Sequence, residues 1–222
     1  MVITELKPIE KIWQNIADFR KVLVLGCRGC SGICSTGGDR EVKLLVSALN
    51  LIAENEGKNF IALGQTLIRQ CDPVALKVLP EFLKEVEAVV SLACGVGVNL
   101  IADLYPDLKV YPGTDTLFIG AHVGFGVWEE KCRACGDCFI DKTAGLCPIA
   151  RCPKGLLNGP CGGSQTERCE VNPEIPCVWY EIIIRLEKRG ELASLDEIIG
   201  PKDWRLTFGE GPRKRQREDL TF

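Results

Sequence analysis

The first 126 residues alternate between continuous apolar runs and segments whose apolar residues recur at helical spacing. Residues 21–26 (KVLVLG) are typical of a strand buried on both faces. Residues 39–56 instead place Val42, Leu45, Val46 and Leu49 on one helical face. By the same reading, we expect strands at residues 21–26, 59–63, 88–92, 109–111 and 116–119, and helices at residues 9–19, 39–56, 72–86 and 95–104. Asp39 is expected to be one N-cap, and Asp72-Pro73 an N-cap followed by a proline at the first helical position.

This alternation of strands and helices predicts an α/β domain over residues 1–126. Parallel strands need crossover connections, and helices serve as those connections on both faces of the sheet. The expected architecture is therefore a parallel sheet of the Rossmann or flavodoxin-like kind. Ligands in such sheets bind at the carboxyl ends of the strands, where the strand order reverses.

The pattern changes from Trp128 onward. Eight of the thirteen cysteines fall within residues 132–177, together with many Gly and Pro, and regular periodicity is lost. Such a stretch buries too little apolar side chain to fold unaided, so we expect residues 127–208 to form an irregular, metal-stapled segment with C-terminal helices at 179–189 and 195–199. Residues 209–222, with the basic run 213–217, are expected to form a solvated extension.

Charge and composition narrow the class of protein. The net charge of −3 gives no general argument for nucleic-acid binding, and no apolar run is long enough for a membrane span. With no secretory signal in view, we expect a cytoplasmic location, where thiols stay reduced. The thirteen cysteines are also an odd number. Metal binding is therefore a better explanation for them than a disulfide framework.

The first cysteine group follows the strand at residues 21–26. Cys27, Cys30 and Cys34 lie in one glycine-containing loop that can present three thiolates to a single centre. Cys94, which follows the strand at 88–92, is the expected fourth ligand, and Cys71 is the alternative. A 4Fe–4S cluster is favoured, while a zinc site and uncoordinated thiols are the competing interpretations.

The second group contains eight thiols, enough for two four-thiolate centres. The run Cys132-x2-Cys135-x2-Cys138 opens the cysteine pattern of bacterial ferredoxins. The remaining members are Cys147, Cys152, Cys161, Cys169 and Cys177. Two 4Fe–4S clusters are favoured over one cluster with one zinc, or two zinc sites. The sequence leaves open which cysteine belongs to which centre.

Longer motifs around these cysteines resemble a known family. The fragments are Cys132-x2-Cys135-Gly-x-Cys138, Cys147-Pro, Cys152-Pro-Lys-Gly-Leu-Leu-Asn-Gly-Pro-Cys161-Gly-Gly, Cys169-Glu-Val-Asn and Cys177-Val-Trp. They resemble the methylenetetrahydrofolate reductase C-terminal domain family. In the first half, Gly26-Cys27-x2-Cys30-x3-Cys34, Arg69-Gln-Cys71 and Ser91-Leu-Ala-Cys94-Gly-Val-Gly-Val resemble the MetV-type small subunit of that reductase.

The resemblance implies an accessory subunit that is not itself catalytic. Such subunits pair with a flavin-containing, TIM-barrel catalytic subunit, which reduces methylenetetrahydrofolate to methyltetrahydrofolate in one-carbon metabolism, notably in the acetyl-CoA (Wood–Ljungdahl) pathway. The small subunit would relay electrons through iron–sulfur clusters, fed by ferredoxin or a further electron-donor subunit.

Two other functions stay open. The cysteines could hold zinc in a scaffold that docks the catalytic subunit to a larger redox complex. Alternatively, Cys71 or Cys94 could be the nucleophile of an independent enzyme, although no base lies nearby in the sequence.

Overall fold

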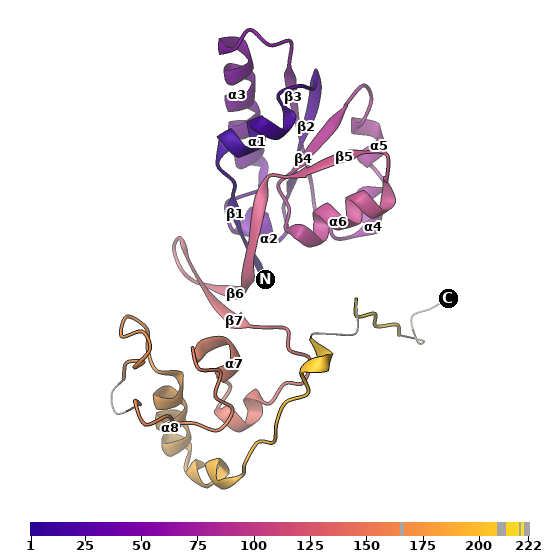
Figure 1. The fold of residues 1–222 in the computed structure, drawn as a ribbon. Coiled ribbons are helices and arrows are strands. Elements are labelled where there is room, and N and C mark those ends of the chain that lie inside the picture. Colours follow the sequence, from indigo (N-terminus) through magenta and orange to yellow (C-terminus); the bar gives the residue numbers. More distant parts are fainter. Residues whose placement is uncertain (165–166, 208–211, 218, 220–222) are drawn as a thin grey trace. The chain divides into compact units, whose positions relative to one another are not determined.

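The structure is a computed structural model that describes residues 1–164, 167–207, 212–217 and 219 (Figure 1). The chain divides into two compact units, Met1–Glu129 and Glu130–Phe222. The sequence analysis placed the corresponding boundary after residue 126. We call these the N-terminal and the C-terminal unit.

A four-stranded parallel sheet forms the centre of the N-terminal unit. Its strands are β2 (Lys21–Cys27), β3 (Ile61–Leu67), β4 (Ala88–Ser91) and β5 (Lys109–Pro112), in the spatial order β3-β2-β4-β5. Each neighbouring pair is parallel. The predicted α/β class with a parallel sheet is confirmed. Since β2 has β3 on one side and β4 on the other, the strand order reverses at β2.

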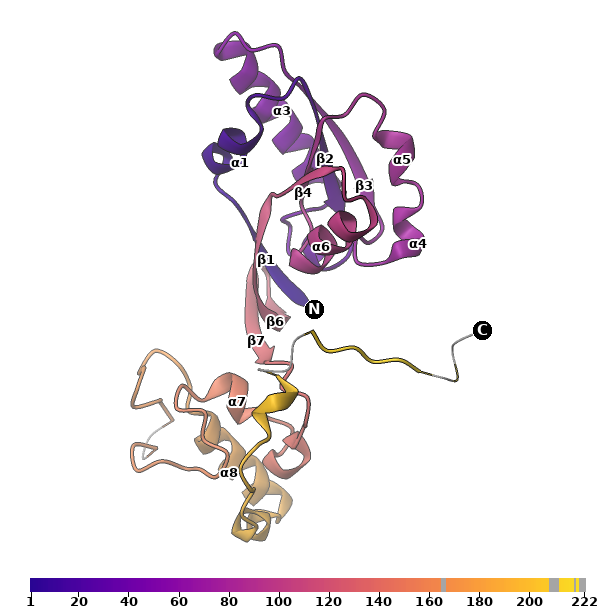
Figure 2. The same ribbon diagram turned by 45° about the vertical axis from the view of Figure 1, so that its right-hand side comes forward.

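Helices cover both faces of this sheet (Figures 1 and 2). Along β2, Val22 and Val24 pack into a core with α1 (Ile9–Ile16) and α3 (Asp39–Asn55). The alternating residues Leu23 and Leu25 pack into a second core with α4 (Pro73–Leu76), α5 (Leu79–Phe82) and α6 (Gly95–Leu104). The continuous apolar run of β2 is explained by burial on two sides.

Two predicted helix details were wrong. The expected helix at residues 72–86 is two short helices, α4 and α5. Pro80 has no N–H for an intrahelical hydrogen bond, so it is tolerated only in the first turn of a helix, and α5 begins one residue before it. The N-cap of α3 is Gly38 rather than Asp39, and its backbone N–H donates to the Glu41 carboxylate at 2.9 Å. The N-cap at Asp72 is confirmed, since its carboxylate accepts from the backbone N–H of Val74 at 2.9 Å.

A separate antiparallel sheet was missed by the sequence analysis. Its strands, in the order β1-β6-β7, are β1 (Val2–Leu6), β6 (Thr114–Gly124) and β7 (Val127–Cys132). The predicted short strand at 116–119 is the middle of the eleven-residue β6. The pairing of β1 with β6 joins residues more than a hundred positions apart, such as Val2 and Ile119, so no local sequence pattern predicts this pairing.

The C-terminal unit contains little regular structure. Its helices are α7 (Pro148–Arg151) and α8 (Val178–Arg189), with 3-10 turns η1 (Ile140–Thr143), η2 (Leu192–Asp196) and η3 (Trp204–Leu206). The helix predicted at 179–189 is confirmed, whereas the one predicted at 195–199 is the 3-10 turn η2 instead. Seven buried residues form the core of this unit: Ala144, Leu146, Cys177, Val178, Trp179, Ile182 and Leu186.

The predicted extension at 209–222 lies partly outside the described residues. Within the described part, residues 212–217 are exposed, and Arg213 donates to the backbone oxygen of Leu206 at 2.7 Å. Among the helices of the described residues, none is both long and apolar enough to cross a membrane.

Candidate metal centres

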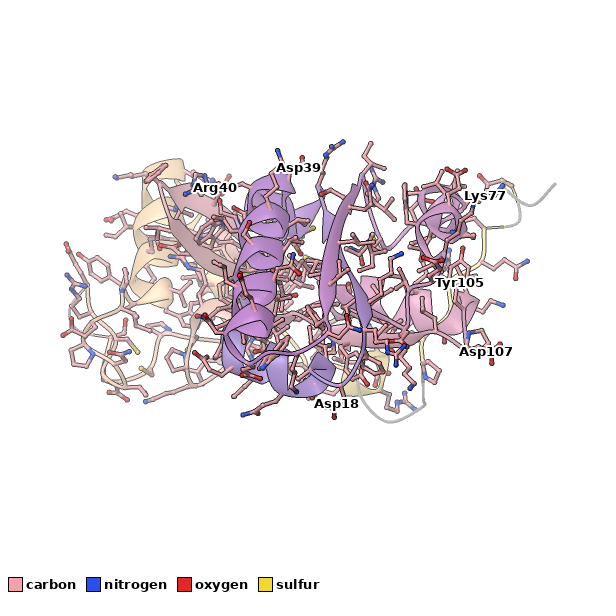
Figure 3. The ribbon with its side chains drawn as sticks, turned by 90° about the horizontal axis from the view of Figure 1, so that it is seen from above. Asp18, Asp39, Arg40, Lys77, Tyr105 and Asp107 are labelled. Carbon is pink, nitrogen blue, oxygen red and sulfur yellow. The ribbon has the colours of Figure 1, made fainter. Side chains whose placement is uncertain are left out.

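The cysteines of the N-terminal unit gather at the carboxyl ends of three neighbouring strands. Cys27 is the last residue of β2, and Cys94 is the N-cap of α6, three residues after β4. Cys71 follows β3 and precedes the N-cap of α4. This is the expected ligand position in an open parallel sheet. In Figure 3, Asp39 is labelled at the start of α3 and Asp18 near the opposite end of that helix.

Four of these thiols are close enough to influence one another. Cys71 is exposed; partial burial raises the pKa of its thiol, and the neighbouring charges of Cys27, Cys94 and Cys30 raise it further. Cys27 ends β2, Cys71 follows β3 and Cys94 follows β4, so these thiols stand at the same edge of the sheet. We call Cys27, Cys30, Cys71 and Cys94 the sheet-end thiols.

Cys34 is not among the sheet-end thiols, although the sequence analysis grouped it with Cys27 and Cys30. It follows the short helix α2 (Cys30–Ile33) and is buried, with its Sγ 3.8 Å from the backbone oxygen of Val2 in β1. One helical turn separates Cys30 from Cys34, yet the second thiol contacts the antiparallel sheet. Cys71 and Cys94, by contrast, follow the two strands that flank β2, the strand that ends at Cys27.

The loop between Cys27 and α3 is held tightly against the end of β4. A side chain at Gly37 would place its Cβ 2.0 Å from the backbone oxygen of Leu92, so only glycine allows this approach. Ser31, next to Cys30, is 1 % exposed, and its hydroxyl has no hydrogen-bond partner among the described residues. An orphaned buried hydroxyl beside thiols fits a site that receives a sulfur-rich group.

One charged pair flanks this site. Arg28, between Cys27 and Cys30, donates from Nε to the Asp39 carboxylate at 2.8 Å. The bond to Arg28 lowers the pKa of Asp39 and raises that of Arg28. Because both side chains are exposed, the pair orients the loop more than it stabilises the fold.

In the C-terminal unit, one group of thiols surrounds Cys147. Burial raises the pKa of Cys147, while hydrogen bonds from the backbone N–H groups of Ala150 and Ile149 lower it, and the charges of Cys135 and Cys132 raise it. These three cysteines therefore lie near one another. Cys138 belongs to the same Cys-x2-Cys-x2-Cys turn, which curls through left-handed backbone at Ala134 (φ 50°) and Gly136 (φ 88°).

Backbone N–H groups also point at the sulfur atoms of this group. Besides the two that reach Cys147, the N–H of Ala134 donates to the Sγ of Cys132 at 3.3 Å. Hydrogen bonds to sulfur stabilise the thiolate over the thiol, and a metal or an iron–sulfur cluster needs thiolates. The donor pattern fits such a group.

The remaining four cysteines line one cavity. Cys152, Cys161, Cys169 and Cys177 all face it, with Trp179 and Ser164 beside them. The Cys169 N–H donates to the Ile175 carbonyl at 3.1 Å and the Cys177 N–H to the Glu167 carbonyl at 2.8 Å, so a hairpin brings two of the thiols together. The Ser164 hydroxyl lies 3.2 Å from the Sγ of Cys177. Among the described residues, no three Cys, His, Asp or Glu side chains are close enough to hold a single metal ion.

A match to a known protein family covers the cysteine-rich segment. Residues 111–205 match the sequence family described as methylene-tetrahydrofolate reductase C terminal. The match confirms the resemblance seen in the cysteine motifs and is consistent with a MetV-type small subunit. It links the chain to methylenetetrahydrofolate reductase. It includes Cys132 through Cys177 and leaves the sheet-end thiols outside. No curated protein and no solved structure matches the chain.

The sequence analysis quoted two buried polar residues of the N-terminal site only as members of motifs and gave them no role. Gln70 and Ser91 are both 0 % exposed; Gln70 directly precedes Cys71, and Ser91 stands three residues before Cys94. The available signal was a polar residue within a few positions of a cysteine at the end of an apolar strand. It was not used, because periodicity alone assigns such positions to loops.

Proposed function

We propose that this chain is the iron–sulfur electron-transfer subunit of a methylenetetrahydrofolate reductase complex. It relays electrons to the flavin of a TIM-barrel catalytic subunit, which reduces methylenetetrahydrofolate to methyltetrahydrofolate in one-carbon metabolism. The acetyl-CoA pathway is the setting that the resemblance favours. The observation that carries the proposal is the family match over residues 111–205, which includes eight of the thirteen cysteines.

The three groups define the proposed ligand sets. The first is the sheet-end group, Cys27, Cys30, Cys71 and Cys94. The second is Cys132, Cys135, Cys138 and Cys147, and the third is Cys152, Cys161, Cys169 and Cys177. Four thiolates per group match the ligand number of a 4Fe–4S cluster. Cys34 is left as a buried thiol.

Iron–sulfur clusters supply one-electron chemistry with little change in geometry. The residues of this chain hold the thiolates in place and limit the access of water to them. Cys27, Cys94, Cys169 and Cys177 are buried, whereas Cys132 and Cys138 are exposed. Backbone N–H groups are directed at Cys132 and Cys147. Such donors stabilise the more negative, reduced state of a bound cluster and so contribute to its reduction potential.

Proposed partners follow from the same role. The flavin-containing catalytic subunit accepts the electrons, and ferredoxin or a further electron-donor subunit provides them. Many cysteines that stay reduced are typical of a reducing compartment, which supports a location in the cytoplasm. No catalytic residue is assigned to this chain.

A structural zinc is the second candidate, for the third thiol group alone. Those four thiols line one cavity, and four thiolates are also the ligand set of a tetrahedral structural zinc. In that case the third group staples the fold, and the two other groups carry electrons. Zinc in every group would make the chain a docking scaffold.

The decisive experiment is the content of iron, acid-labile sulfide and zinc per chain, in protein purified without oxygen together with its catalytic subunit. About twelve irons with equal sulfide indicate three clusters, and about eight irons with about one zinc indicate zinc in one group. Zinc without sulfide overturns the relay in favour of the scaffold. Reduction of the bound flavin through this chain, lost when the iron is removed, completes the test.

A further inference from the structure

A buried glutamine joins two strand ends at the sheet-end thiols. Gln70 lies in the loop after β3 and is 0 % exposed. Its side-chain Nε2 donates to the backbone oxygen of Leu25 at 2.8 Å and of Gly26 at 3.0 Å, both in β2. The amide of one loop is therefore tied to the last residues of the central strand.

A buried serine extends the connection to the third strand. Ser91, the last residue of β4, is also 0 % exposed, and its hydroxyl donates to Oε1 of Gln70 at 2.6 Å. The same hydroxyl oxygen accepts from the backbone N–H of Ala93 at 3.3 Å. The hydrogen-bonding groups of both side chains are thus engaged in one chain of bonds, and such satisfied buried networks are rigid.

The endpoints of this network explain its importance. It joins Gly26, Gln70 and Ala93, and each of these residues directly precedes a cysteine of the site: Cys27, Cys71 and Cys94. Among the described residues, Gln70 and Ser91 are the only polar residues with 0 % exposure. The network therefore connects the backbone beside three thiols at the ends of three different strands.

The sheet itself does not need this network. The carbonyl of Leu25 already accepts a ladder bond from the N–H of Leu92 at 2.8 Å, and β2 pairs with β3 and β4 through regular parallel registers. Close packing surrounds the glutamine as well, since a side chain at Gly97 would place its Cβ 2.9 Å from that of Gln70. An apolar side chain here would leave the Ser91 hydroxyl and the Gly26 carbonyl without this partner, and it would not tie the three loops together.

We propose that Gln70 and Ser91 are positioning residues that hold the thiols of Cys27, Cys71 and Cys94 at the separation an iron–sulfur cluster requires. This inference rests on the proposed function, because it assumes that the sheet-end thiols bind a cluster. Neither side chain is a ligand. Both act through the backbone that carries the ligands, as residues behind metal ligands commonly do.

The test uses the full chain with its catalytic subunit, purified without oxygen. Cys71→Ala first identifies, by difference, which electron paramagnetic resonance signal of the reduced protein belongs to this centre. Gln70→Leu and Ser91→Ala are then compared with wild type for that signal, for its midpoint potential and for the rate at which a chelator removes its iron. We expect altered g-values, a shifted potential and retention of iron weakened about 10- to 100-fold, with the other signals unchanged.

Two further variants separate positioning from general stability. Asn50→Leu removes a side chain that bridges α3 to the N–H and carbonyl of Ala62, at 2.8 and 3.2 Å, on a strand of the same sheet but without contact to a cysteine. It should lower the melting temperature and leave the signal of this centre unchanged. Ser91→Thr keeps the hydroxyl and should restore the wild-type signal that Ser91→Ala loses.

The outcomes are distinct for the two proposals. Wild-type protein without iron and sulfide overturns the proposed function. If wild-type protein holds the cluster, and the Gln70→Leu and Ser91→Ala variants equal it in g-values, potential and iron loss, only the positioning role is overturned. If Gln70→Leu does not fold, the pair Ser91→Ala and Ser91→Thr decides by the same three measurements.

Discussion

The two units of this protein present thiols in opposite ways. In the N-terminal unit, a parallel sheet with an apolar core on each face exists independently of the cysteines, and the thiols are attached to its strand ends. In the C-terminal unit, Cys177 is itself part of a core of only seven buried residues. We therefore expect the first unit to position its thiols and the second to depend on bound metal to fold.

Removal of bound metal should give the largest difference in stability between the two units. A structural metal site contributes on the order of 10 kcal/mol or more to folding, so a chelator should unfold the C-terminal unit and leave the parallel sheet intact. Hydrogen exchange followed by mass spectrometry checks this, with protection lost at α8 and retained at β2 and β4. Equal protection of α8 with and without metal would show that its small core suffices.

Replacing single cysteines of the N-terminal unit should give the next largest contrast. Cys71→Ser should remove the sheet-end cluster, about four irons per chain, because the proposed ligand set is Cys27, Cys30, Cys71 and Cys94. Cys34→Ser should keep the full iron content, because that Sγ faces the carbonyl of Val2. Iron analysis decides between the two residues. The reverse result would restore Cys34 as the ligand that the loop spacing predicted.

A smaller effect is expected from the core of the C-terminal unit. Trp179 is 2 % exposed, its indole N–H donates to the carbonyl of Leu156 at 3.2 Å, and Gly159 packs against its ring. Trp179→Ala should lower the free energy of unfolding by about 3–5 kcal/mol, measured by denaturant titration of the metal-loaded protein. Trp204→Ala, at a side chain 44 % exposed, is the matched control and should cost much less.

The smallest effect concerns a local cap in the N-terminal unit. Asp72 follows Cys71 and accepts from the N–H of Val74, so Asp72→Ala should cost about 1 kcal/mol. Because the network of Gln70 and Ser91 holds the Cys71 loop, the iron content should be unchanged. Thermal unfolding combined with iron analysis measures both quantities. A loss of iron would mean that the cap, not the buried network, sets the position of Cys71.

The parallel sheet was predictable because its signals are local. The apolar run at 21–26 became β2, and the run at 88–92 became β4, since a strand buried on two faces needs apolar residues at successive positions. The C-terminal positions of Cys27 and Cys94 on those strands followed directly. In contrast, the sheet of β1, β6 and β7 was missed, because its strands pair residues that are far apart in the sequence.

The sequence by itself determined the α/β class, the supply of thiols and the family resemblance, because strand runs, cysteine spacing and motifs are all read within a few residues. Only the tertiary structure decided which strand ends carry the thiols of the N-terminal unit. Cys34 is four residues from Cys30 but contacts β1, while Cys71 is far along the chain and joins Cys27 through the neighbouring strand. The physical reason is that a cluster site depends on distance in space, and strand order in the sheet sets that distance.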